Sequence, residues 1–213
     1  MVDSLRLTEM FLSLQGEGEH TGLICYFIRT SGCDLRCRWC DTSYSWTGGK
    51  KYSIDSIIES IPSKVPLIQI TGGEPLLQKE GVIQLIERLP NHKILLETAG
   101  HQSLEGLPKQ THIVMDIKLA GSNEQNHPFE NNFQYIKPSD EIKFVIADRA
   151  DYDSTKKWIH NYSLDQLCKI LVSPVFGELA PVDLAKWVIQ DRLPVRLQLQ
   201  QHKFIWNPDQ RGV

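Results

Sequence analysis

The stretch ICYFIRTSGCDLRCRWCDT, residues 24–42, joins a run of β-branched and aromatic residues to a polar loop that holds three of the chain's five cysteines. The apolar run predicts a buried strand over residues 24–32. Cys33, Cys37 and Cys40 follow it with the spacing C-x₃-C-x₂-C. In sheets of parallel strands, ligands bind at the carboxyl ends of the strands, so the sequence places these three thiols at the functional edge of such a sheet.

Similar apolar runs recur along the chain and alternate with helical patterns. Further strands are expected at 5–14, 66–73, 93–100, 112–118, 141–148, 169–175 and 195–203. Helices are expected at 53–61 with Ser53 as the N-cap, 77–89, 151–162 and 181–190. This alternation favours an α/β fold with a mainly parallel sheet or barrel. The polar segment 119–140 is expected to be a long loop with one short helix.

Composition narrows the class of protein. The chain has 213 residues, of which 41% are hydrophobic and 23% charged, as in an ordinary globular domain. Its net charge of −3 argues against general electrostatic binding to nucleic acid. No run approaches the ~18 apolar residues of a membrane span, and residues 1–11 lack the order of a signal peptide. We therefore expect a reducing, cytoplasmic environment, in which clustered cysteines bind metal rather than form disulfides.

Three thiolates from one loop fill three positions of a metal centre. Zinc takes four protein ligands when structural, or three plus water when catalytic, so a structural zinc site would need a distant histidine or Cys168. A [4Fe–4S] cluster takes four ligands, and a set of three leaves one iron open to a substrate or cofactor. The charged residues among the cysteines disfavour a third interpretation, unliganded core thiols. Cys25 and Cys168 are expected to be small buried apolar residues.

The cysteine loop resembles the signature of the radical S-adenosylmethionine (SAM) superfamily, which has an aromatic residue, here Trp39, before the last cysteine. A second stretch, ITGGEP at 70–75, resembles the glycine-rich segment of that superfamily, although alone it would be an ordinary turn at a strand end. The resemblance implies a partial TIM-type barrel over residues 1–213 as a single radical SAM domain. It also implies a [4Fe–4S] cluster on the three cysteines and SAM on the open iron.

Four further stretches resemble the 7-carboxy-7-deazaguanine synthases, a family of radical SAM lyases in queuosine biosynthesis. They are LQGEGEHTG (14–22), RTSGC (29–33), CDT (40–42) and NPDQRGV (207–213). The resemblance implies conversion of 6-carboxy-5,6,7,8-tetrahydropterin to 7-carboxy-7-deazaguanine, by ring contraction with loss of ammonia. It further implies Mg²⁺, a homodimer and a reductant such as flavodoxin or ferredoxin, with no nucleic acid or membrane partner.

The resemblance assigns roles to matching positions of this sequence. Substrate contacts are expected from Leu14, Gln15, Gly16, Arg29, Thr71 and the carboxylate of Val213. SAM contacts are expected from Trp39, Cys40, Asp41, Gly73, Asp116, Ile117 and Lys118. Thr42 is expected to coordinate Mg²⁺, an ion that prefers hard oxygen ligands. The guanidinium of Arg29 would grip the substrate carboxylate. Further candidates are Glu17, Glu97 and His202.

Simpler interpretations apply to several of these residues. Glu17 would be a solvated loop charge, Lys118 a surface residue and His202 a structural histidine at a strand end. Val213, as the last residue, would be frayed. The sequence DIK at 116–118 also departs from many members of the family, which carry Ser or Pro there, so the details of the SAM contacts stay open.

Two other functions fit the cysteine loop. A radical SAM activase that installs a glycyl radical on a partner enzyme would share the loop and the chain length, but not the combination of LQGEG, RTSGC and CDT. An electron-transfer iron–sulfur protein would need a fourth cysteine to close its cluster. That function, like a zinc-binding module, leaves TGGEP unexplained.

Overall fold

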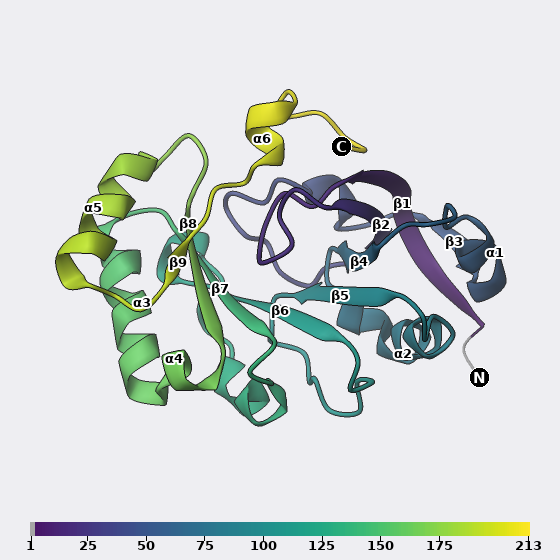
Figure 1. Cartoon of the computed structure of the whole chain (residues 1–213), viewed down its shortest axis with the longest axis horizontal. Coiled ribbons are helices and arrows are strands. Elements are labelled where there is room, and N and C mark those ends of the chain that lie inside the picture. The colour runs from purple at the N-terminus through teal and green to yellow at the C-terminus, as the bar shows by residue number, and fades with distance from the viewer. Residues whose placement is uncertain (1–2) are drawn as a thin grey trace.

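Nine strands form one curved sheet in the computed structural model, which describes residues 3–213 (Figure 1). The strands are β1 (Ser4–Leu14), β2 (Ile24–Thr30), β3 (Lys50–Ser53), β4 (Leu67–Gly72), β5 (Lys93–Thr98), β6 (His112–Ile117), β7 (Glu141–Ile146), β8 (Lys169–Pro174) and β9 (Arg196–Leu197). Their order across the sheet is β3-β1-β2-β4-β5-β6-β7-β8-β9. Neighbouring strands from β2 to β9 are parallel, and β1 is antiparallel to β2 and β3. The predicted α/β fold with a mainly parallel sheet is confirmed.

Helices lie in most of the connections between the parallel strands, and α1 to α5 cover one face of the sheet (Figure 1). The α-helices are α1 (Ile54–Glu59), α2 (Lys79–Glu87), α3 (Arg149–Tyr162), α4 (Leu164–Leu167), α5 (Pro181–Asp191) and α6 (His202–Ile205). The 3₁₀ helices are η1 (Ser43–Ser45), η2 (Pro75–Gln78), η3 (Ala120–Ser122) and η4 (Phe129–Tyr135). Ser53 caps α1 as predicted, because its Oγ accepts a hydrogen bond from the Ser56 amide at 3.1 Å. No helix within residues 3–213 is long and apolar enough to cross a membrane.

The main hydrophobic core lies between the sheet and the helices, and the opposite face of the sheet has a much smaller apolar cluster. That cluster consists of Cys25, Phe27, Leu67 and Leu95, with Phe11 packed against it. Cys25 and Cys168 are both buried as expected, and burial raises the pKa of each thiol to about 12. Cys168 precedes the amino end of β8, whereas the cysteine loop follows the carboxyl end of β2. The structure therefore gives Cys168 a packing role.

The predicted strand over 195–203 is wrong beyond Leu197. After β9, one more ladder-like bond forms between the Gln198 amide and the Val172 carbonyl at 2.9 Å, and the chain then turns into α6. The alternating glutamines imitate a strand, but the side chains of Gln198 and Gln200 donate to Glu17 in the loop between β1 and β2. The sequence analysis also did not predict the short edge strand β3, the helices η1, η2, α4 and α6, or a second 3₁₀ helix in segment 119–140.

The loop between β1 and β2, residues 15–23, crosses the inner side of the curved sheet. Its Gly18 amide donates to Gln198 Oε1 at 2.6 Å, and its Glu19 amide donates to Glu141 Oε1 at 2.9 Å. The Gln201 amide donates to the Gly16 carbonyl at 3.0 Å. Gly18 has a φ of +76°, which favours glycine. The loop thus ties β1 and β2 to β7 and the segment after β9.

Candidate active site

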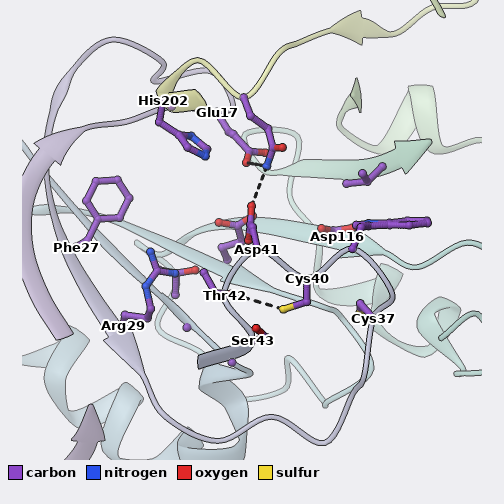
Figure 2. A pocket seen from close by; sticks show the side chains of 18 of the residues that line it. Glu17, Phe27, Arg29, Cys37, Cys40, Asp41, Thr42, Ser43, Asp116 and His202 are labelled. Carbon is purple, nitrogen blue, oxygen red and sulfur yellow. Dashed lines mark hydrogen bonds between the residues drawn. The ribbon is translucent and has the colours of Figure 1, made fainter. Parts of the chain in front are cut away.

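A pocket of about 830 Å³ opens on the inner side of the sheet, at the carboxyl ends of the parallel strands (Figure 2). The sequence-predicted residues that line it are Leu14, Gln15, Gly16, Glu17, Arg29, Cys33, Cys37, Trp39, Cys40, Asp41, Thr42, Thr71, Gly73, Glu97, Asp116, Lys118, His202 and Val213. Ile117 is the exception, because it is fully buried in the main core. Successive side chains of a strand face opposite sides, so Ile117 turns away from the pocket between Asp116 and Lys118.

Hydrogen bonds to Ser122 and Glu124, which are distant in the sequence, hold the cysteine loop, residues 33–42. The Arg38 amide donates to the Ser122 carbonyl at 3.1 Å, and the Arg36 amide donates to Glu124 Oε1 at 2.5 Å. Within the loop, the Cys40 amide donates to the Cys37 carbonyl at 3.2 Å. Burial raises the pKa of Cys37 to about 11. Three half-buried thiols on one pocket fit a cluster site, and binding a metal there would release their protons.

The glycine motif packs directly against the start of the cysteine loop. A Cβ atom on Gly73 would lie 2.2 Å from the Gly32 carbonyl oxygen, and one on Gly72 would lie 2.3 Å from the Thr30 carbonyl oxygen. The Gly73 amide donates to Thr30 at 3.2 Å and the Glu74 amide donates to Gly32 at 2.8 Å. These two amides are therefore used within the protein and are not free to bind a ligand in the pocket. Two motifs that are far apart in the sequence form one structural unit.

Glu74 of this motif shapes the end of the next strand. Its carboxylate is fully buried and accepts hydrogen bonds from the Leu76 amide at 2.9 Å, the Thr98 hydroxyl at 2.8 Å and the Ala99 amide at 2.9 Å. Burial raises the pKa of Glu74 above its ordinary value. The three donors fix the turns after β4 and β5 relative to each other, so Glu74 has a structural role at the edge of the pocket.

Arg29 presents a free edge of its guanidinium to the pocket (Figure 2). Its Nε donates to Glu9 Oε1 at 2.7 Å, and its side chain is 14% exposed. Within residues 3–213, its two terminal nitrogens have no hydrogen-bond partner. Two parallel N–H groups on a rigid fork match the geometry of a carboxylate.

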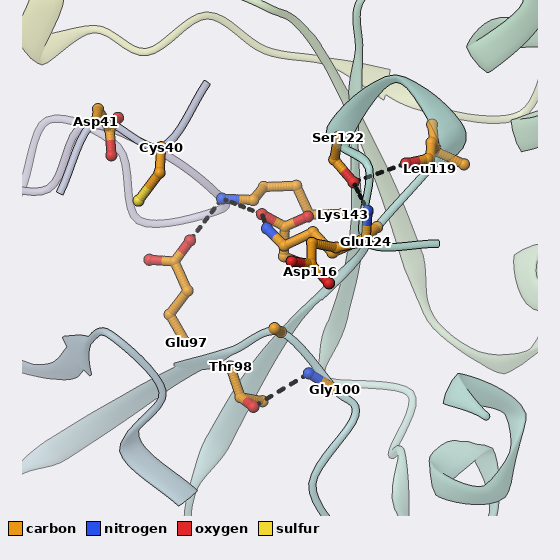
Figure 3. Close-up of polar contacts among 12 residues, drawn as sticks. Cys40, Asp41, Glu97, Thr98, Gly100, Asp116, Leu119, Ser122, Glu124 and Lys143 are labelled. Atoms are coloured by element: carbon orange, nitrogen blue, oxygen red, sulfur yellow. Dashed lines mark hydrogen bonds and ion pairs between the residues drawn. The ribbon is translucent and has the colours of Figure 1, made fainter. Parts of the chain in front are cut away.

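Lys143 lies at the centre of a group of buried charges that sequence reasoning missed (Figure 3). Its Nζ is 3.0 Å from Glu17 Oε2, 2.5 Å from Glu97 Oε1 and 3.4 Å from Asp116 Oδ2, and its side chain is 5% exposed. We call these four residues the Lys143 cluster. A lysine inside the apolar strand EIKFVI was a signal that we could have used.

Mutual attraction keeps the Lys143 cluster ionised. Burial alone would lower the pKa of Lys143, but the three carboxylates raise it well above its ordinary value. Burial likewise opposes ionisation of Glu17 and Asp116, yet Lys143 lowers the pKa of Glu17, and Lys118 and Lys143 lower that of Asp116. Lys118 Nζ lies 2.9 Å from Asp116 Oδ2 and its side chain is 15% exposed. Interpreting Glu17 as a solvated charge and Lys118 as a surface residue is therefore wrong.

The segment after β9 covers the pocket and bonds to both of its walls. Gln200 Nε2 donates to Glu17 Oε1 at 3.0 Å and to Asp41 Oδ2 at 3.2 Å, and Lys203 Nζ is 3.1 Å from Asp41 Oδ2. His202 packs so closely on Gly16 that a Cβ there would lie 2.3 Å from its Nδ1. Burial lowers the pKa of His202, which favours a neutral ring. His202 starts α6 and points into the pocket, so its position at a strand end was wrongly predicted (Figure 2).

The pocket also has groups that suit the polar end of SAM. Asp116 Oδ1 is buried and, within the described residues, has no hydrogen-bond partner. A buried carboxylate oxygen without a partner is costly, and an ammonium group bound beside it would satisfy it. Trp39 offers an apolar ring on the same wall. The residues present therefore fit both a cluster and its SAM ligand.

Comparison with known proteins identifies the class that this fold and pocket define. The model of the radical SAM superfamily matches residues 27–136, which include both the cysteine loop and the glycine motif. The chain is therefore a radical SAM protein. The crystal structure of QueE from Escherichia coli has the same fold, with a TM-score of 0.74 over 93% of this chain and 95% of that chain at 22% identity.

Relatives that match the whole chain give the particular family. The chain is 40% identical to the 7-carboxy-7-deazaguanine synthase of Koribacter versatilis, over 98% of this chain and 100% of the relative. It is also 40% identical to the 7-carboxy-7-deazaguanine synthase of Chlorobaculum tepidum, over 98% of this chain and 97% of the relative. The chain belongs to the 7-carboxy-7-deazaguanine synthase family. The predicted family is confirmed, and the activase alternative is not favoured.

Proposed function

We propose that this protein converts 6-carboxy-5,6,7,8-tetrahydropterin to 7-carboxy-7-deazaguanine, with loss of ammonia. The observation that carries the proposal is identity of 40% to synthases of that name over almost the whole chain. The pocket supports it, because landmarks scattered from residue 14 to residue 213 of the sequence meet there.

Cys33, Cys37 and Cys40 would hold a [4Fe–4S] cluster, with one iron left for SAM. Such a cluster, once bound and reduced, would supply one electron for the reductive cleavage of SAM. Asp116 would bind the methionine ammonium through its unpartnered oxygen, and Lys118 would help to hold that carboxylate in place. The backbone of Gly73 and the ring of Trp39 complete the proposed SAM contacts.

The opposite side of the pocket would bind the pterin. The terminal nitrogens of Arg29 would receive the substrate carboxylate as a bidentate pair. Gln15 is 4% exposed and Thr71 is 7% exposed, so their polar groups would meet the substrate away from bulk water. The carboxylate of Val213 would accept from the heterocycle, and His202 would exclude water from the same side.

Thr42 would contribute to a magnesium site next to the substrate. Its Oγ1 faces the pocket 3.8 Å from Cys40 Sγ, which places a hard oxygen between the cluster ligands and Arg29 (Figure 2). Mg²⁺ usually keeps several waters and takes few ligands from the protein. A magnesium site in which the Thr42 hydroxyl is the protein ligand, and substrate oxygens take further positions, is consistent with that behaviour.

The remaining proposals concern assembly and partners. We infer that residues 1–213 act as one radical SAM domain, since one sheet and one main core unite the described chain. Leu12, Leu23 and Ile24 are 49%, 48% and 51% exposed at one end of β1 and β2, which supports a homodimer. A flavodoxin or ferredoxin would deliver the electron. Five free cysteines suit the reducing cytoplasm.

Anaerobic turnover tests the proposed function. Reconstituted protein, dithionite, SAM and 6-carboxy-5,6,7,8-tetrahydropterin are expected to yield 7-carboxy-7-deazaguanine and ammonia, the former measured by liquid chromatography with mass spectrometry. The Cys37→Ala variant serves as the control without a cluster. Absence of the deazaguanine, together with formation of a glycyl radical on a partner enzyme, would favour the activase instead.

A further inference from the structure

Three contacts in series connect the C-terminal tail, residues 207–213, to Arg29. The Arg211 guanidinium lies over the Tyr44 ring, 4.0 Å from its centroid. The Tyr44 hydroxyl donates to Glu9 Oε1 at 2.8 Å, and the same oxygen accepts from Arg29 Nε at 2.7 Å. Arg29, Tyr44 and Arg211 line the pocket, whereas Glu9 lies behind Arg29 and is not a lining residue. The proposed function gives no role to Tyr44, Glu9 or Arg211.

Tyr44 occupies a fixed position relative to the cysteine loop. It is the middle residue of η1. The Gly32 amide donates to the Ser45 carbonyl at 2.8 Å, and the Cys33 amide donates to the Trp46 carbonyl at 3.2 Å. These bonds hold the backbone on the C-terminal side of Tyr44, so the ring forms a firm platform beside the pocket.

Glu9 fixes which edge of the Arg29 guanidinium faces the pocket. Glu9 and Arg29 are direct cross-strand partners on β1 and β2. Because Glu9 takes Nε, the terminal nitrogens are left for a ligand. The Tyr44 hydroxyl is the second donor to the same carboxylate oxygen, and it restrains the rotation of Glu9.

The tail itself has little structure of its own. Residues 207–213 form neither helix nor strand. The hydrogen bonds that its Asp209 and Gln210 amides donate, at 3.0 and 2.9 Å, both go to Asn207 within the tail. Arg211 on Tyr44 is the contact that ties this segment to the body of the protein, and it stands two residues before the terminal carboxylate.

We propose that Tyr44 is a positioning residue that fastens the C-terminal tail over the pocket through Arg211 and orients Arg29 through Glu9. The proposal rests on the proposed function, in which Arg29 and the Val213 carboxylate both meet the substrate. The Tyr44 side chain then links Arg29 and the Val213 carboxylate, the two groups proposed to bind the substrate. Loss of Tyr44 would weaken the substrate contacts of both.

Limited proteolysis tests the attachment of the tail without cofactor or substrate. Trypsin cleaves after Arg211 and releases Gly212–Val213. Tyr44→Leu is expected to accelerate this cleavage about 2- to 5-fold, the effect of losing one cation–π contact at an exposed site. Tyr44→Phe keeps the ring and is expected to be cleaved at the wild-type rate. Cleavage at the exposed Lys109 serves as the internal reference.

A matched control removes a stacked arginine elsewhere. The Arg149 guanidinium lies over the Tyr152 and Trp187 rings, 5.2 and 5.4 Å from their centroids. Arg149→Gln is expected to leave the cleavage after Arg211 unchanged. Equal cleavage of wild type and Tyr44→Leu would overturn the proposal. Should Tyr44→Leu fail to fold by circular dichroism, Arg211→Gln must show faster amide exchange over residues 207–213, and unchanged exchange overturns the proposal.

Steady-state kinetics tests the second half of the proposal. Tyr44→Phe removes one hydrogen bond to Glu9 and is expected to raise the KM for the carboxypterin about 3- to 10-fold, with kcat nearly retained. Arg211→Gln is expected to add little to Tyr44→Leu, because the two residues act together. Additive effects, or a lower kcat at unchanged KM, would contradict the proposal. If wild type makes no product, the proposed function fails, while the proteolysis still decides whether Tyr44 fastens the tail.

Discussion

The cysteine loop and the Lys143 cluster line the same pocket but are built in different ways. The loop is one continuous stretch, residues 33–42, and its three thiols are neighbours in the sequence. The Lys143 cluster takes Glu17 from the β1–β2 loop and one residue from each of β5, β6 and β7. Local sequence therefore supplies the candidate metal ligands, whereas the charged group exists only when the sheet has formed.

The two regions also balance charge differently. Burial raises the pKa of Cys33 and Cys37, so the loop favours protonated thiols until a metal binds. In the Lys143 cluster the buried ammonium stabilises the charged forms of the three carboxylates, and Lys118 supplies a second positive charge beside Asp116. Substitutions in the loop should thus remove chemistry and spare the fold, and substitutions in the cluster should also cost stability.

The largest effect is expected for Cys37→Ala, which removes one cluster ligand. The variant should fold, but it should bind little iron after reconstitution and produce no 5′-deoxyadenosine from SAM. Iron analysis, visible absorbance and chromatography measure these outcomes. Cys168→Ala is the matched control and should keep both the cluster and the cleavage. A brown, active Cys37→Ala protein would show that the loop does not supply the ligands.

Lys143→Met tests how much the Lys143 cluster contributes to the stability of the fold. Removing the cation leaves the half-buried carboxylates of Glu17 and Glu97 without their ion pair, while Asp116 keeps Lys118, and the free energy of unfolding should fall by about 1–3 kcal/mol. Urea denaturation measures it. Lys169, whose side chain is 52% exposed, pairs with Glu19, and Lys169→Met should cost less than about 1 kcal/mol. Equal stability of Lys143→Met and wild type would mean that the cluster is not held by charge balance.

Arg29→Ala separates binding from the cluster chemistry. Cluster assembly should be unaffected, because Arg29 lies on β2 before the cysteine loop. Substrate binding should weaken by about 1.5–3 kcal/mol through the lost charged hydrogen bonds, seen as a higher KM. Arg88→Ala, which breaks an exposed ion pair with Asp55, is the control and should leave KM unchanged. An unchanged KM in Arg29→Ala would remove Arg29 from the substrate site.

The smallest effect is expected from the pH dependence that His202 contributes. Its pKa is lowered in the folded protein by burial, so below about pH 6.5 the unfolded state binds more protons. Stability should therefore fall as the pH drops from 7 through 6.5, and this loss ends near the lower folded pKa. His202→Gln should flatten that part of the curve of unfolding free energy against pH. An unaltered slope would show that the ring is not buried in solution.

The cysteine side of the pocket could be predicted from local sequence. Three thiols at fixed spacing, a glycine pair at a strand end and an apolar run before each loop need no knowledge of distant residues. Apart from β3, the strands from 24 to 174 and the four main helices were predicted for the same reason, since periodicity and capping are local properties. The segment after β9 was mispredicted because the same alternation of apolar residues and glutamine suits either a strand or a cover over a pocket.

The sequence by itself determined the candidate metal ligands, the α/β class and the family, because those depend on residue types at short spacing. Tertiary structure alone decided that Lys143 meets three carboxylates, that Gly73 must lack a side chain beside Gly32, and that Arg211 reaches Tyr44. These contacts join residues from 27 to 167 positions apart, and no local pattern specifies which of many charged or aromatic residues will meet. Only the curvature of the sheet and the burial that it imposes select them.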